Sequence, residues 1–229
     1  MRWHVGTPML APPPEVKRIM SASIENPHFV LRRLHSLFGL LPVGAFLMFH
    51  LWENSQSRFG ALHYNDKVVG WLQGLNYLPL LELFVIALPL LFHAAYGLVI
   101  LRSGRAEVVR YRHPRNHLYW LQRISGIAIL LFLLVHVGLT RGYTIIEPAV
   151  TDDLFTHMQQ ILTQPWMFII YLAGLSLSVF HLANGLWNMA VVWGLTTSAQ
   201  AQHLFGCLCA AIGTLLTAMG IHGLIGFLP

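Results

Sequence analysis

The sequence alternates five long apolar runs with short polar segments. Each run has about 20 residues, enough for an α-helix to cross a hydrocarbon core of about 30 Å. The runs are Leu34–Trp52, Pro79–Leu101, Tyr119–Thr140, Pro165–Trp193 and Leu204–Leu228. This pattern predicts an all-α integral membrane protein that folds as a bundle of five transmembrane helices.

The third connection between these runs, Gly142–Gln164, carries a weaker signal. Its Phe155, Met158 and Leu162 recur at helical spacing and predict a short helix at the membrane interface.

Basic residues predict the orientation of the bundle. Eleven of the fourteen Lys and Arg lie in the N-terminal segment or around the second connection. They are Arg2, Lys17, Arg18, Arg32, Arg33, Arg102, Arg105, Arg110, Arg112, Arg115 and Arg123. By the positive-inside rule these regions face the cytoplasm, and after five spans the C-terminus lies outside. We therefore expect a cytoplasmic N-terminal extension, residues 1–27, and a single transmembrane domain, residues 28–229.

Composition agrees with a membrane location and excludes other classes of protein. Hydrophobic residues make up 55% of the chain and charged residues 10%, whereas charged residues average about a quarter of soluble domains. The net charge of +5 does not indicate a nucleic-acid partner, because the cations flank apolar runs. Cys207 and Cys209 form no Cys-x-x-Cys-His motif, so covalent attachment of a c-type haem is excluded.

Four histidines lie one each in the first four apolar runs, and their depths can be compared. At about 1.5 Å per residue, His50 lies about 26 Å outward of Arg33, and His136 lies about 20 Å outward of Arg123. Both histidines therefore belong to the outer half of the membrane.

The two remaining histidines belong to the inner half. On the descending helices, His93 lies about 21 Å inward of Pro79, and His181 lies about 24 Å inward of Pro165. The topology thus pairs His50 with His136 and His93 with His181.

Two imidazoles at equal depth on different helices are what an iron porphyrin needs above and below its plane. We expect two stacked b-type haems, with His50 and His136 binding the outer iron and His93 and His181 the inner iron. Two imidazoles leave the iron six-coordinate, which favours electron transfer over oxygen binding. A single intramembrane histidine could equally be an interhelical hydrogen-bond partner, but four at matched depths favour haem ligation.

Small and polar residues near these histidines are candidate haem contacts. Gly97 and Gly185 each follow a histidine by one turn, where a glycine admits a macrocycle or a neighbouring helix. Ordinary helix packing would explain either glycine alone.

At the inner boundary, cations and hydroxyl groups are available for the haem propionates. The candidates are Arg33, Ser36, Arg123 and Ser125, although the arginines could instead anchor the helices at the interface. We expect His35 to contact a propionate or a quinone rather than iron, and His222 to be structural.

Several longer motifs resemble a known family. They are Arg32-Arg33-Leu-His35-Ser36-Leu-Phe-Gly39, Pro42-Val-Gly44, Leu-Pro89-Leu-Leu-Phe-His93-Ala-Ala-Tyr-Gly97, Leu-Gln122-Arg123-Ile-Ser-Gly126 and Phe-His181-Leu-Ala-Asn184-Gly185-Leu-Trp187. The chain resembles, over roughly residues 28–195, the dihaem cytochrome b anchor of succinate dehydrogenase and fumarate reductase.

The resemblance implies a multi-pass subunit of the bacterial cytoplasmic (inner) membrane. Its implied partners are a flavoprotein with FAD, an iron-sulfur protein with its clusters, the lipid bilayer and a quinone, commonly menaquinone. It also implies that electrons pass from the iron-sulfur subunit to the inner haem, then to the outer haem and the quinone. The dicarboxylate site would lie on the flavoprotein rather than on this chain.

Quinone reduction consumes protons, so a titratable group is expected near the outer haem. Glu82 is the one carboxylate inside a predicted span, and Asp66 lies in the outer connection. We expect Glu82 first and Asp66 second as candidates for quinone protonation, with a helix-holding hydrogen bond as the alternative role of Glu82.

Two other functions are compatible with intramembrane histidines. The chain could be the cytochrome b subunit of a hydrogenase or formate dehydrogenase, which should lack the boundary motifs at Arg32 and Gln122. It could also be a proton or metal-ion transporter, which should show broken helices or a continuous polar path.

Overall fold

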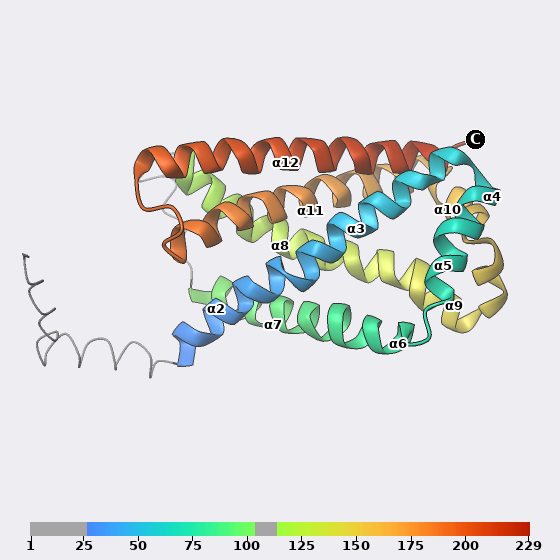
Figure 1. Ribbon diagram of the computed structural model, residues 1–229, viewed down its shortest axis with the longest axis horizontal. Helices are drawn as coiled ribbons and strands as arrows, with labels where there is room; N and C mark the ends of the chain where they lie inside the picture. Colours follow the sequence, from blue (N-terminus) through green and yellow to red (C-terminus); the bar gives the residue numbers. More distant parts are fainter. Residues whose placement is uncertain (1–26, 104–113) are drawn as a thin grey trace, which may run out of the picture.

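The computed structural model describes residues 27–103 and 114–229. Within these ranges the chain is helical, and five helices are long and apolar enough to cross a membrane (Figure 1). The spans are His28–Phe59, Leu78–Arg102, Pro114–Ile146, Pro165–Val192 and Ala199–Gly226. The predicted all-α bundle of five transmembrane helices is therefore confirmed. The expected N-terminal extension lies outside the described residues except for its last residue.

The first span is divided near its middle into two helical segments. It consists of α2 (Pro27–Leu40) and α3 (Pro42–Ser55), which meet at Leu41. Pro42 has no N–H to donate and its ring crowds the preceding turn, which bends a helix. The N–H of Leu41 still donates to the backbone oxygen of Leu37 at 2.8 Å, so the backbone is not unwound at this point.

Three segments near one end of the bundle adopt the wider π-helical turn. The second span consists of α6 (Leu78–Leu81), η3 (Glu82–Ala87) and α7 (Leu88–Ser103). The third consists of α8 (Pro114–Val137), η4 (Gly138–Gly142) and α9 (Tyr143–Ile146). Of these, η3 and η4 are π-helical, as is η2 in the first connection. Such turns are frequent at functional sites.

The last two spans form the most closely packed side of the bundle. They are α11 (Pro165–Val192) and α12 (Ala199–Gly226), which pack against each other. Helix α12 also packs against α3, α11 against α8, and α2 against α7. The spans thus surround an interior onto which the first four helices bring their histidines.

Short helices cover one end of the bundle, which we call the outer end (Figure 1). The first connection contains η1 (Gln56–Phe59), α4 (Ala61–His63), η2 (Tyr64–Val69) and α5 (Gly70–Gln73), and the third contains η5 (Pro148–Asp153) and α10 (Leu154–Leu162). The predicted helix around Phe155, Met158 and Leu162 is confirmed as α10, but these residues are buried in protein. They pack with Tyr64 and Phe227 in a hydrophobic cluster.

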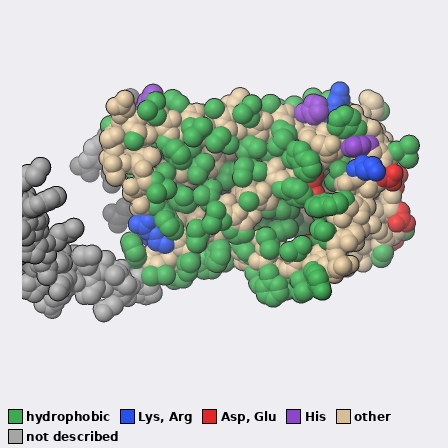
Figure 2. Space-filling model, in the orientation of Figure 1, with side chains coloured by type: hydrophobic (Ala, Val, Ile, Leu, Met, Phe, Trp, Pro, Cys, Tyr) green, Lys and Arg blue, Asp and Glu red, His purple; other side chains and the backbone are tan. Residues whose placement is uncertain are grey.

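Charged side chains gather at the two ends of the molecule. Figure 2 shows only basic charged residues at one end of this face, acidic together with basic residues at the other, and a largely apolar surface between them. The described part of the chain begins at the basic end, and the C-terminus lies at the opposite end, beside the short helices (Figure 1). We call the basic end the inner end, following the positive-inside rule.

Candidate functional site

The structure brings the four intramembrane histidines together in two pairs. The rings of His50 on α3 and His136 on α8 have centroids 5.7 Å apart, at an interplanar angle of 72°. The rings of His93 on α7 and His181 on α11 have centroids 6.1 Å apart, at 87°. These are the two pairs that the depth calculation predicted.

The separations within the pairs suit one metal ion between two imidazoles. Metal–imidazole bonds of about 2 Å place two opposed ring centroids about 6 Å apart. No group of three or more His, Cys, Asp or Glu among the described residues could hold a metal ion by itself. A metal between two histidines would therefore need further ligands from elsewhere, and a porphyrin supplies four nitrogens.

Hydrogen bonds at Nδ1 orient the inner pair. The His93 Nδ1 donates to the backbone oxygen of His35 at 2.8 Å. The His181 Nδ1 lies 3.0 Å from the Ser125 hydroxyl, which itself donates to the Gln122 carbonyl at 3.0 Å. The serine oxygen is thus the acceptor for His181. Both rings are left with Nε2 for a metal, the arrangement typical of metal-binding histidines.

The outer pair has different hydrogen-bond partners. The His136 Nδ1 lies 3.4 Å from the Tyr171 hydroxyl on α11. The Asn54 amide donates to the His50 backbone oxygen at 2.8 Å and lies 3.3 and 3.4 Å from the two ring nitrogens of His50. Tyr64 in turn donates to Asn54 Oδ1 at 3.1 Å. A polar chain therefore runs from His50 toward the outer connection.

Glycines face the rings of the inner pair. A Cβ added at Gly39 would overlap the ring of His93, and one at Gly126 would lie 3.2 Å from His181 Cε1. These positions allow close approach of neighbouring helices. The predicted glycines lie nearby but face other groups. A Cβ added at Gly97 would lie 3.3 Å from His35 Cε1, and one added at Gly185 would lie 3.3 Å from Gln122 Nε2.

At the inner end, His35 stacks on one of the paired rings. The His35 and His93 rings are parallel within 6° and their centroids are 4.0 Å apart. The His35 Nδ1 is buried without a hydrogen-bond partner among the described residues, and so is the Nε of Arg123. Two unsatisfied buried donors of this kind suit an anionic group such as a haem propionate.

The remaining candidates at the inner end have aromatic partners. The Arg33 guanidinium lies 5.1 Å from the ring centroids of both Phe29 and Trp193, and that of Arg123 lies 3.6 Å from the Tyr119 ring. Ser36 accepts from the Trp193 indole at 3.1 Å. Arg33, Ser36 and Arg123 thus lie at the inner boundary, whereas the hydroxyl of Ser125 contacts His181 directly.

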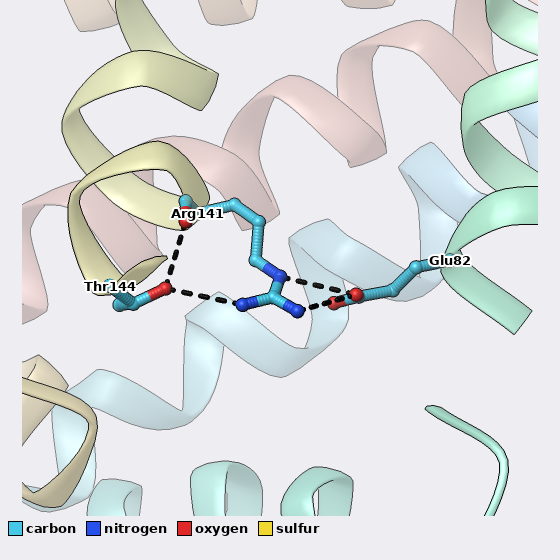
Figure 3. A network of polar contacts seen from close by, with 3 residues as sticks. All are labelled: Glu82, Arg141 and Thr144. Atoms are coloured by element: carbon cyan, nitrogen blue, oxygen red, sulfur yellow. Dashed lines mark hydrogen bonds and ion pairs between the residues drawn. The ribbon is translucent and has the colours of Figure 1, made fainter. Parts of the chain in front are cut away.

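Two predicted candidates lie at the outer end. Glu82, the first residue of η3, accepts two hydrogen bonds from the Arg141 guanidinium, at 2.9 and 3.1 Å (Figure 3). Arg141 also contacts Thr144 at 3.4 Å. This ion pair joins η3 to η4 and was not anticipated from the sequence. Asp66 in η2 is exposed.

Sequence reasoning missed a second carboxyl group near the outer pair. Glu53 on α3 is 6% exposed, and its Oε1 has no hydrogen-bond partner in the described part of the chain. It lies one residue beyond the predicted end of the first span, Trp52. Its spacing of three residues from His50, which places both on one helix face, was the available signal.

Comparison with known proteins gives consistent matches. Residues 105–220 match the family "Succinate dehydrogenase/Fumarate reductase transmembrane subunit". The chain is also 36% identical over 202 residues to the succinate dehydrogenase cytochrome b558 subunit of Bacillus subtilis (strain 168). That alignment covers 88% of this chain and 98% of the relative.

Proposed function

Since the chain belongs to the family of succinate dehydrogenase and fumarate reductase transmembrane subunits, we propose that it anchors a succinate:quinone oxidoreductase and carries its electrons to quinone. Its partners would be an iron-sulfur subunit and a flavoprotein subunit, bound at the inner end. The quinone, of the menaquinone type, would react near the outer end. In this orientation the chain would lie in a bacterial cytoplasmic membrane, with its basic end toward the cytoplasm.

The two histidine pairs carry this proposal. Haem b bound at each pair would supply one-electron transfer between the iron-sulfur subunit and quinone. His93 and His181 would hold the inner haem, and His50 and His136 the outer haem. The separations within the pairs, and the Nδ1 hydrogen bonds that orient three of the four rings, support this assignment.

The inner boundary residues would bind the propionates of the inner haem. The unsatisfied nitrogens of His35 and Arg123 support contact with an anion, and Arg33 and Ser36 lie at the same boundary. We propose that Ser125 orients His181 through its hydroxyl, which differs from the propionate contact expected from the sequence. Gly97 and Gly185 would keep the helices close enough to enclose the macrocycle.

The structure gives no support to the transporter alternative. The junction between α2 and α3 retains its backbone hydrogen bond at Leu41, so it is not an unwound segment. The ion pair of Glu82 and Arg141 lies at the outer boundary and is partly exposed. It does not belong to a polar path through the described part of the membrane-spanning region.

Reduced-minus-oxidised spectra of the purified complex test the proposal. We expect b-type bands from two haems, resolved as two steps in a redox titration. His93→Ala should remove the inner haem, and His136→Ala should remove the outer haem. Loss of the same step in both variants would refute the pairing, and absence of b-type bands in the wild-type complex would refute the proposal itself.

A further inference from the structure

Glu53 is a buried carboxyl group with no assigned role. Its side chain is 6% exposed, and Oε1 has no hydrogen-bond partner among the described residues. The single ion pair in the described part of the chain joins Arg141 and Glu82, so no basic side chain compensates Glu53. Because burying an uncompensated charge is costly, a group of this kind is usually functional within a membrane.

The position of Glu53 connects it to the outer histidine pair. Glu53 and Asn54 lie three and four residues after His50, so all three residues share one face of α3. The Asn54 amide lies within 3.4 Å of both ring nitrogens of His50, and Asn54 Oδ1 accepts from Tyr64. Polar groups therefore extend from the histidine to the outer connection, alongside Glu53.

Tyr64 is the phenol that donates to Asn54 in this arrangement. It is 7% exposed, and its burial, together with the charge of Glu53, raises its pKa well above the usual value. Tyr64 therefore keeps its proton and remains a donor to Asn54.

We propose that Glu53 supplies protons from the outer side to the quinone that is reduced at the outer end. The proposal rests on the proposed function, because it requires quinone reduction there. It deepens that function by naming a proton-relay residue. Tyr64 and Asn54 would serve as positioning residues that hold the polar surroundings of the carboxyl group.

The step balances in atoms and charge. Reduction of one quinone to a quinol takes two electrons and two protons. The electrons come from succinate through the partner subunits, and each proton leaves a Glu53 carboxyl O–H and ends on a quinone oxygen. The resulting carboxylate is reprotonated from outer water before the next transfer. Glu53 lies near the end of the first span, which shortens the route from outer water.

Glu53 suits this role better than the two carboxylates expected from the sequence. The Glu82 carboxylate already has a partner, because it accepts two hydrogen bonds from Arg141. Asp66 is exposed, so nothing in its surroundings distinguishes it from other surface carboxylates. Of these three carboxyl groups, only that of Glu53 is buried and has an oxygen, Oε1, with no hydrogen-bond partner in the part of the chain that the structure describes.

The test uses the complete complex in lipid nanodiscs. Haems are first reduced with succinate, and their reoxidation by a water-soluble naphthoquinone is followed by stopped flow. For Glu53→Gln we expect reoxidation at least about tenfold slower, while reduction by succinate keeps its rate. Glu147→Gln is the matched control, because it removes an exposed carboxylate from the outer connection and should leave both rates unchanged.

A second measurement reports on the carboxyl group itself. Redox-induced infrared difference spectra should contain a carboxyl C=O band that is absent in Glu53→Gln and shifted in Glu53→Asp. If Glu53→Gln fails to assemble, the infrared measurement uses Glu53→Asp instead. This variant keeps a carboxyl group and should shift the C=O band.

The outcomes separate this inference from the proposed function. Unchanged reoxidation in Glu53→Gln, an equal slowing of haem reduction by succinate, or an infrared band unaffected by substitution would each overturn the inference. Slower reoxidation in Glu82→Gln with a normal rate in Glu53→Gln would assign the role to Glu82 instead. If the wild-type complex shows no b-type bands, the proposed function fails before Glu53 is tested.

Discussion

Replacing Ser125 with alanine should change the redox potential of the proposed inner haem alone. The Ser125 hydroxyl is 3.0 Å from the Nδ1 of His181, and the residue is 2% exposed. Water therefore cannot easily replace the lost acceptor. A hydrogen bond at Nδ1 makes the imidazole a more basic ligand, which favours the oxidised iron. Its removal should raise the potential.

The size of the shift follows from the strength of one hydrogen bond. Such a bond contributes about 1 kcal/mol net. For a one-electron couple, a tenfold change in the equilibrium constant, or about 1.4 kcal/mol, corresponds to about 59 mV. If the full bond energy distinguishes the two oxidation states, Ser125→Ala should raise the inner potential by up to about 40 mV.

A redox titration of the purified complex, followed at the b-type bands, measures both potentials. Tyr171→Phe is the reciprocal variant, because Tyr171 lies 3.4 Å from the Nδ1 of His136 and should affect the outer haem alone. Ser176→Ala is the control, since that hydroxyl bonds to the backbone oxygen of its own helix at 2.8 Å. An unchanged inner potential in Ser125→Ala, or equal shifts of both haems, would refute the reasoning.

Two further predictions concern stability. A Cβ at Gly223 would lie 2.9 Å from the backbone oxygen of Asn54, so Gly223→Ala should destabilise the packing of α12 on α3 by about 1–3 kcal/mol. Thermal unfolding in detergent measures this loss. Gly138→Ala is the control, because a Cβ at Gly138 would meet open space. Asp153 caps α10, and its hydrogen bonds with Thr156 lower its pKa. A lowered carboxyl pKa stabilises the fold above the unfolded pKa, and this stability is lost as pH falls through the folded value. Acidification should therefore lower the protection factors of the α10 amides, corrected for the intrinsic exchange rate, and in Asp153→Ala these factors should be low already at neutral pH.

The transmembrane helices could be predicted because bilayer thickness sets a minimum apolar length. Hydropathy located all five spans. The predicted and observed ends agree best for the fourth span, which was predicted as Pro165–Trp193 and is observed as Pro165–Val192. The first span extends well beyond the predicted Leu34–Trp52, to His28 and Phe59. A helix can continue into the interface without further apolar residues, so hydropathy alone does not mark its ends.

The pairing of the histidines was also predictable, because it depends only on depth and topology. Their hydrogen-bond partners were not, because these depend on the rotation of each helix about its axis. Ser125 was expected at a propionate, yet its hydroxyl points to His181. Tyr171 was not considered, although it lies beside His136. Side-chain direction in a bundle follows from packing against neighbours, which a single sequence does not specify.

The burial of Glu53 depends on parts of the chain that hydropathy treats as connections. Tyr64 of η2 and Phe155 of α10 pack with Phe227 in the cluster that covers the outer end of the bundle. Tyr64 of this cluster also donates to Asn54, the residue after Glu53 at the end of α3. The short helices therefore create the condition that makes Glu53 unusual. Variants that loosen the cluster, such as Phe155→Ala, should expose the end of α3 to water, and faster amide exchange in α3 would show it.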